Sequence, residues 1–123
     1  MTEFCLRPLE WVGSSKRDLK EFPDRVQDRF GYALYQAQIG LKHRDAKPLV
    51  GLGPGVLEVV ADFDGNTFRA VYTVRFHNAV YVLHAFQKKS KRGISTPKPE
   101  IEVVRRRLTA AELHRRKSLG EES

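Results

Sequence analysis

The strongest constraint on the fold is an alternation of apolar and polar residues that runs from Val56 to Lys88. A period of two is typical of β-strands that bury one face. Two short turn sequences interrupt the alternation, Asp64-Gly65-Asn66 and His77-Asn78, and the glycine of the first can adopt positive φ in a hairpin turn. The sequence therefore predicts a meander of three antiparallel strands over residues 56–63, 68–76 and 80–88.

The residues before this meander predict a short strand and two helices. Residues 4–9 are apolar apart from Arg7 and Pro8, which suits an edge or terminal strand. Ser14 or Ser15 can cap a first helix, and Pro23 ends it because proline suits the first turn of a new helix. Apolar residues at helical spacing mark the second helix, which should stop at Gly40: Val26, Phe30, Ala33, Leu34 and Ala37. Residues 41–55, rich in glycine and cations, are expected to form a loop.

Positive charge is concentrated near the C-terminus. Between His84 and Lys117 lie 11 of the 22 Lys and Arg residues but only three of the 15 Asp and Glu residues, so this segment carries +8 and the rest of the chain −1. Crowding of like charge opposes compaction, which indicates an anionic partner, with nucleic acid as the first candidate. Thr96 as N-cap and prolines at 97 and 99 predict a last, basic helix with an apolar stripe: Ile101, Val104, Leu108 and Ala111.

The expected architecture is α+β, in the order β-α-α-β-β-β-α. A small antiparallel sheet is covered by two N-terminal helices and a basic C-terminal helix. Residues 1–117 should form a single domain and residues 118–123 a frayed tail. The sequence shows neither a signal peptide nor a membrane span, so a cytoplasmic protein is expected. Cys5 is the sole cysteine, so we expect no internal disulfide, and we predict neither a metal site nor a cofactor.

Four sequence segments together resemble the RelE/HigB/ParE toxin superfamily, and within it the phage-related HigB-type branch. They are Glu58 in the first hairpin strand, Phe68-Arg69-Ala70-Val71-Tyr72 in the second, residues 82–90 (VLHAFQKKS) in the third, and residues 96–101 (TPKPEI) opening the last helix. The resemblance covers the chain from about Trp11 to Leu113.

This resemblance implies the toxin of a type II toxin–antitoxin pair. Such a toxin would enter the ribosomal A site and cut mRNA there as a metal-independent endoribonuclease. Its expected partners are a cognate helix-turn-helix antitoxin, the ribosome and mRNA, with operator DNA contacted only through the antitoxin and no membrane contact. The alternative is a non-enzymatic binding module of the same fold, either a ParE-like gyrase inhibitor or an inactive co-repressor.

Metal-free RNA cleavage requires a base near the 2′-hydroxyl, cations on the phosphate and a donor near the leaving 5′-oxygen. Arg69 is the expected phosphate clamp because its planar guanidinium can hold two oxygens. Lys88 and Lys89 are the candidate bases because crowded like charges lower a lysine pKa. His84 could donate to the leaving oxygen. The residues expected to bind RNA are Lys91, Arg92, Arg75, Arg105 and Arg106.

Each of these assignments competes with a purely structural role. The cations at 88–92 could be a solvated loop that protects an edge strand, and His84 could be a core histidine. Tyr72 and Phe86 are expected in the core more than as stacking platforms. Glu58 could orient a cation in the cleft or pair with a basic residue across the hairpin.

The strand period limits the choice between Lys88 and Lys89, and the end of the last helix limits the choice of the general acid. In a regular third strand Lys88 shares a face with Val80, Val82, His84 and Phe86 while Lys89 points to the other, unless a bulge intervenes. Some relatives use a tyrosine or histidine near the end of the last helix, where this chain offers only His114. The general acid is therefore open at this point.

Overall fold

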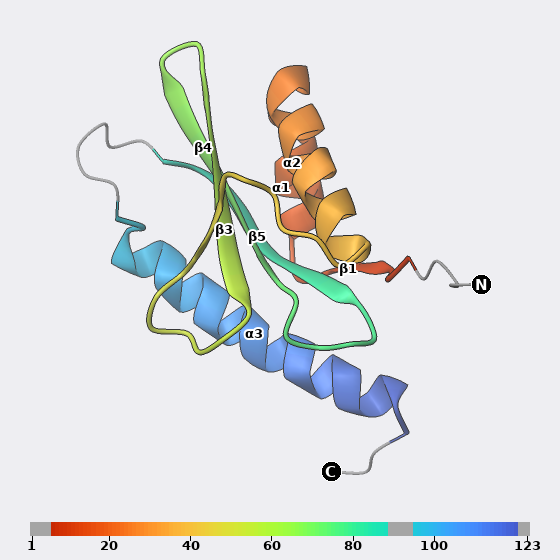
Figure 1. The fold of residues 1–123 in the computed structure, drawn as a ribbon. Helices are drawn as coiled ribbons and strands as arrows, with labels where there is room; N and C mark the ends of the chain where they lie inside the picture. The colour runs from red at the N-terminus through yellow and green to blue at the C-terminus, as the bar shows by residue number, and fades with distance from the viewer. Residues whose placement is uncertain (1–5, 89–94, 121–123) are drawn as a thin grey trace.

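The computed structural model describes residues 6–88 and 95–120, and places them in a five-stranded sheet with helices on both faces (Figure 1). The order in the sheet is β1-β5-β4-β3-β2, in which only β1 and β5 run parallel. The elements along the chain are β1 (Leu9–Trp11), α1 (Ser15–Lys20), α2 (Asp24–Gln38), β2 (Ala46–Pro48), β3 (Val56–Phe63), β4 (Asn66–Thr73), β5 (Val80–Lys88) and α3 (Lys98–Ser118).

The predicted α+β class and the central meander are confirmed. β3 and β4 are joined by Asp64 and Gly65, both with positive φ (53° and 77°), as a two-residue hairpin turn requires. The predicted apolar stripe of α2 is buried throughout, and Gly40 follows the helix with φ 86°. None of the helices in the described part of the chain is long and apolar enough to cross a membrane.

Four predictions about the strands are wrong, and one of them is the start of β4, which is Asn66 instead of Phe68. Of the strand expected over residues 4–9, residues 6–8 are irregular and residues 4 and 5 lie outside the described chain. The strand lies at Leu9–Trp11, where the chain pairs with β5, and Arg7 before it donates to the carbonyls of Phe76 and Ala37 at 3.1 Å each. β4 ends at Thr73 instead of Phe76, where the Thr73 hydroxyl donates to the Gly55 carbonyl and accepts from the Arg75 N–H. The segment expected to be a loop contains β2, which pairs with β3.

Two helix starts also differ in detail from the prediction. Ser14 is the N-cap of α1, but its hydroxyl donates to Asp18 Oδ2 (2.7 Å) instead of accepting from the backbone. Pro97, not Thr96, is the N-cap of α3, which leaves the Thr96 side chain available to bond elsewhere. The structure describes α3 to Ser118, and residues 121–123 of the expected tail lie outside the described chain.

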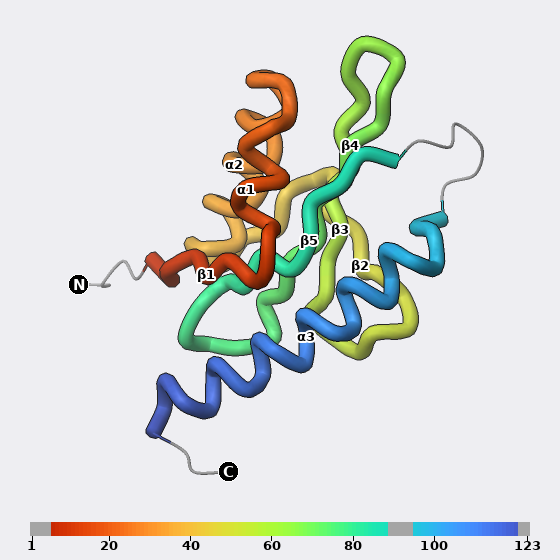
Figure 2. Tube along the Cα trace, turned by 180° about the vertical axis from the view of Figure 1, so that it is seen from behind, coloured from red at the N-terminus to blue at the C-terminus, as the bar shows by residue number. Residues whose placement is uncertain are grey.

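The sheet separates two hydrophobic clusters. One lies between the sheet and α1/α2 and includes Phe30, Tyr72 and Val82. The other includes Val71, Tyr81 and Phe86 and lies toward α3. Figure 2 shows α3 on the other side of the sheet from α1 and α2. In β3 and β4 every second residue joins the cluster toward α1/α2, whereas Val56 and Val71, at the alternate positions, face α3. The faces of β3 and β4 are therefore those that the period of two predicted.

A β-bulge breaks this alternation in β5. His84 pairs with Val71 and Val82 with Tyr72, so Leu83 is an additional residue between two consecutive pairs. Before the bulge Val82 packs on the α1/α2 side, and after it Phe86 packs on the α3 side. The strand is therefore not regular, and the exception allowed for a bulge applies: Val80 and Val82 share one face, whereas Phe86 lies on the other because the bulge turns the C-terminal half of β5 over.

Candidate functional site

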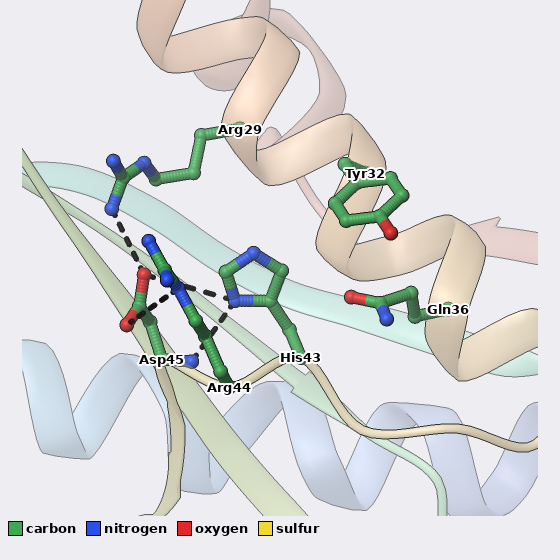
Figure 3. Close-up of a pocket in the computed structure, with 6 residues that line it drawn as sticks. All are labelled: Arg29, Tyr32, Gln36, His43, Arg44 and Asp45. Atoms are coloured by element: carbon green, nitrogen blue, oxygen red, sulfur yellow. Dashed lines mark hydrogen bonds and ion pairs between the residues drawn. The ribbon is translucent and has the colours of Figure 1, made fainter.

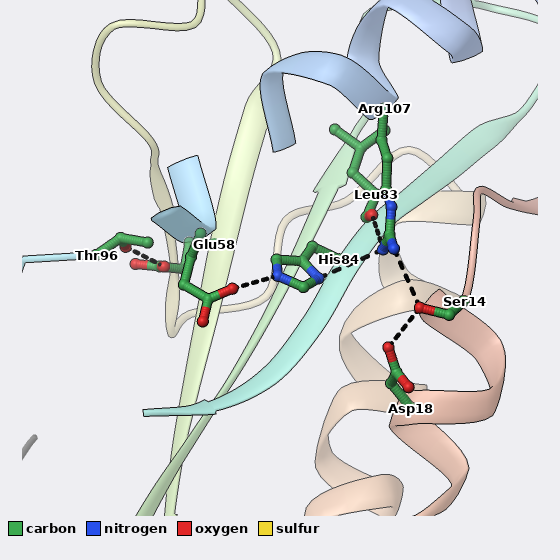
Figure 4. Close-up of polar contacts among 8 residues, drawn as sticks. Ser14, Asp18, Glu58, Leu83, His84, Thr96 and Arg107 are labelled. Carbon is green, nitrogen blue, oxygen red and sulfur yellow. Dashed lines mark hydrogen bonds and ion pairs between the residues drawn. The ribbon is translucent and has the colours of Figure 1, made fainter. Parts of the chain in front are cut away.

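Two polar pairs lie on the α3 side of the sheet, near the start of α3. They join residues of three strands, because Glu58, Arg69 and His84 project from β3, β4 and β5 on this face. The first turn of α3 and the residues before it supply the partners Thr96 and Glu100. Figure 4 shows Glu58 and Thr96 on one side of this place and His84 and Arg107 on the other.

The first pair is the ion pair between Arg69 and Glu58. Arg69 Nη1 lies 2.8 Å from Glu58 Oε1, and both side chains are largely buried, with 5% and 11% exposed. The two residues are diagonal neighbours across the hairpin, since Glu58 pairs with Val71 and Arg69 with Val60. Thr96 closes the cluster by donating to Glu58 Oε2 (2.5 Å) and contacting Arg69 Nη1 (3.4 Å). The cross-hairpin pairing considered for Glu58 is therefore present, and it fixes the guanidinium in place.

The second pair is a hydrogen bond between His84 and Glu100. His84 Nε2 lies 2.6 Å from Glu100 Oε1, and Arg107 Nη1 lies 3.4 Å from the other ring nitrogen, Nδ1. Because a guanidinium can only donate, Nδ1 accepts and the proton of the ring belongs on Nε2, where it is donated to Glu100. His84 stacks on Phe86 with ring centroids 4.8 Å apart.

The surroundings of His84 favour its neutral form. Burial lowers the pKa of His84, with a smaller contribution in the same direction from the charge of Arg107, while the hydrogen bond to Glu100 and its charge oppose this shift. Burial also lowers the pKa of Arg107, which the carboxylate of Asp18 opposes. At neutral pH the cluster therefore presents a neutral imidazole between a cation and a carboxylate.

Arg107 ties three elements together at this place. Its guanidinium donates to the Leu83 carbonyl (3.0 Å) at the bulge and to the Ser14 hydroxyl (3.0 Å) at the start of α1 (Figure 4). The guanidinium also lies against Gly13, where an added Cβ would be 2.6 Å from Arg107 Nε. A side chain at position 13 would displace Arg107 from this position.

The lysines expected to act as bases are only partly within the described chain. Lys88 is buried, and its Nζ donates to the Ser95 carbonyl (3.0 Å), so it lies beside the strand end that leads to α3. Lys89, Lys91 and Arg92 lie outside the described residues.

The structure does not bring all the predicted RNA-binding cations together. Arg105 and Arg106 are exposed on the outer side of α3. Arg75 lies at the other end of the molecule, where it donates to the carbonyls of Pro54 (2.9 Å) and Leu52 (2.6 Å). It shares a pocket there with Arg115, which is 15 residues or roughly 22 Å along α3 from Glu100.

A groove of about 590 Å³ opens beside the His84–Glu100 pair, along β5 and between α1 and α3. Its lining contains three carboxylates, those of Asp18, Glu21 and Glu100, and no lysine or arginine among the described residues. The expected core positions of Tyr72 and Phe86 are confirmed, since both are buried, and burial raises the pKa of Tyr72 to about 12. Within residues 6–88 and 95–120 no group of three His, Cys, Asp or Glu side chains could hold a metal ion.

Sequence reasoning did not identify Thr96, Glu100 and Arg107 as site residues. A signal was present in the helical period, because Glu100, Val104 and Arg107 follow one another at i, i+4 and i+7 and so share the face that packs on the sheet. Arg107 also stands in a run of three arginines, residues 105–107, and such a run by itself indicates surface charge.

Comparison with known protein families gives one match. The profile of the family described as "Phage derived protein Gp49-like (DUF891)" matches residues 17–109, well over half of the chain. This range contains both polar pairs and Arg107. No curated protein matches the chain.

Proposed function

The chain belongs to the Gp49-like family of phage-derived proteins, a RelE-like family associated with toxin–antitoxin systems, and we propose that it is the toxin of a type II pair that cleaves mRNA on the ribosome. Within the superfamily we place it in the HigB-type branch. Its partners would be a helix-turn-helix antitoxin, the ribosome and mRNA, and it would reach operator DNA only through the antitoxin.

The observation that carries this proposal is the convergence of the Arg69–Glu58 and His84–Glu100 pairs at the start of α3. Metal-free RNA cleavage needs a fixed cation and groups that can accept and donate protons within one site. Three side chains near this place belong to the required types. They are the cation Arg69, Lys88 at the end of β5, and His84.

In the proposed reaction the 2′-oxygen attacks the adjacent phosphorus, and the bond from phosphorus to the 5′-oxygen breaks. The products are a 2′,3′-cyclic phosphate and a free 5′-hydroxyl. We assign Arg69 to the charge that develops on the phosphate, because its guanidinium stays charged and can hold two phosphate oxygens at once. Lys88 or Lys89, as a neutral amine, would accept the 2′-proton. His84 would donate a proton to the leaving oxygen from its imidazolium form, which its lowered pKa makes the minor form at neutral pH.

A non-enzymatic role remains the second candidate, because one observation favours it. The Arg69 side chain is 5% exposed and already paired with Glu58, so a phosphate could contact it only after Glu58 or its surroundings move. A gyrase inhibitor or an inactive co-repressor of the same fold would need no such movement.

Expression of the protein alone in a bacterial host separates these candidates. The endoribonuclease proposal predicts growth arrest and new 5′ ends in transcripts that depend on translation and keep the codon register. Intact transcripts with gyrase-poisoned chromosomes would favour the gyrase inhibitor, and normal growth with a folded product would favour the co-repressor.

A further inference from the structure

A second polar pocket lies on the opposite side of the sheet, between α2 and the loop before β2. It has a volume of about 470 Å³ and is lined by Arg29, Tyr32, Gln36, His43, Arg44 and Asp45 (Figure 3). The Arg69 and His84 clusters face α3, so this pocket shares no residue with them. Nothing in the proposed cleavage reaction uses it.

The pocket carries one net positive charge. Asp45 holds Arg29 at 2.9 Å between Oδ2 and Nη1, and Arg44 Nε lies 3.8 Å from Oδ1. One carboxylate therefore offsets one of two guanidinium groups, and the Arg44 side chain is 85% exposed. A single phosphodiester or phosphate monoanion would complete this charge balance.

The histidine of the pocket is held as a donor. The Asp45 N–H donates to His43 Nδ1 (3.0 Å), so the ring carries its proton on Nε2. Figure 3 shows this second nitrogen directed toward the space between Arg29 and Tyr32. His43 is itself buried, and packs edge-on against Tyr32 with centroids 5.7 Å apart. The ring of Tyr32 remains 57% exposed and offers a surface for stacking.

Gln36 supplies an acceptor that lacks a donor. Its Oε1 is buried, and no hydrogen-bond partner reaches it from the described residues. Buried polar atoms are nearly always paired, and an exception at the wall of a pocket indicates a ligand that donates.

We propose that this pocket binds one nucleotide, with its phosphate at Arg29 and Arg44, its base on Tyr32 and an exocyclic amine of the base donating to Gln36 Oε1. An acidic peptide side chain would satisfy the charge but would leave Tyr32 exposed. Unpaired RNA bases are commonly stacked on aromatic side chains and read along their polar edges. The choice of an RNA strand over a free nucleotide rests on the proposed function; the nucleotide site itself does not.

Nucleotide binding can be tested on the full-length protein without ribosomes. The protein is titrated with CMP and with UMP, and NMR follows the Gln36 side-chain amide and the backbone amides of residues 43–45. The two bases differ at one ring position, where CMP carries an exocyclic amine and UMP a carbonyl. CMP should shift these signals and bind about tenfold more tightly than UMP.

Gln36→Met should remove the preference for CMP. Tyr32→Ala should weaken binding about tenfold or more. Arg25→Gln, a change to an exposed cation elsewhere on α2, should leave binding unchanged.

Several results would overturn the nucleotide site. These are no shift at millimolar CMP, equal binding of CMP and UMP, or stronger binding of a glutamate-rich peptide to the same residues. A short oligocytidylate that binds more tightly than CMP identifies an RNA strand as the ligand, and equal affinity identifies a free nucleotide. Because cleavage is not measured, failure here leaves the mRNA proposal intact, and failure of that proposal leaves this site intact.

Discussion

The two faces of the central sheet differ in what they bury. The face toward α1 and α2 buries an almost entirely apolar set around Phe30 and Tyr72. The face toward α3 buries apolar residues at one end and two polar pairs at the other, the ion pair Arg69–Glu58 and the hydrogen bond His84–Glu100. Buried charge pairs are weak evidence for stability, since desolvation offsets much of their attraction. The difference indicates that the α1/α2 face mainly stabilises the fold, whereas the α3 face gives up stability to hold polar groups in fixed positions.

The largest loss of stability is expected on the apolar face. Phe30→Ala removes a fully buried ring that contacts Phe22 (centroids 6.1 Å apart) and should lower the free energy of unfolding by about 3–5 kcal/mol. Urea denaturation followed by circular dichroism measures this loss. A loss below about 1 kcal/mol would contradict the assignment of this face as the main source of stability.

The Arg69–Glu58 pair should respond differently to single and double substitution. Arg69→Met leaves Glu58 buried without this partner and should cost about 3 kcal/mol, most of which the added Glu58→Met change should restore. Cleavage of mRNA should fall on the order of 10²-fold or more in both variants.

Arg106→Ala is the matched control for that experiment, because Arg106 is exposed on α3. It should weaken ribosome binding modestly and leave the chemical step unchanged. If the double Met variant cleaves like the parent protein, Arg69 has no role in catalysis, and the α3 face is structural like the other.

The position of Arg107 can be tested through two glycines. Gly13→Ala combines a positive φ (59°) with a Cβ against the guanidinium and should cost about 2 kcal/mol. Gly40→Ala shares a positive φ (86°) but faces open space, so it should cost about 1 kcal/mol. Equal melting temperatures for the two variants would show that the contacts of Arg107 beside Gly13 contribute nothing to the stability of the fold.

The smallest expected effect is a pH dependence from His84. Because its pKa is lowered on folding, the unfolded chain binds more protons than the native chain below about pH 6.5, the ordinary histidine value. The stability of the wild type should therefore be complete above pH 6.5 and decrease as the pH falls through the native pKa.

Melting curves at several pH values between 5 and 8 measure this dependence. His84→Gln should flatten it, whereas His77→Gln, at an exposed position, should not. A parallel pH dependence in the wild type and His84→Gln would contradict the proposed burial of a neutral imidazole.

The features that the sequence predicted correctly are local and periodic. The alternation in residues 56–76 assigned the faces of β3 and β4, and five apolar residues at helical spacing identified the buried side of α2. Glycine at 40 and 65 marked a helix end and a hairpin turn because L-residues rarely adopt positive φ. Each of these signals depends on neighbours within one or two turns of the chain.

Tertiary structure alone decided the composition of the candidate site. The bulge at Leu83 places Phe86 on the α3 side, and the strand period cannot reveal an extra residue whose partner lies in β4. Arg107 turns inward because Leu83 and Ser14, distant in sequence, offer it two acceptors. Arg75 is held near the other end of α3 by the carbonyls of Leu52 and Pro54. Charge and spacing thus determined that a basic C-terminal segment follows a meander of three strands. Which charges meet depends on long-range hydrogen bonds, and these exist only once the sheet and α3 have packed together.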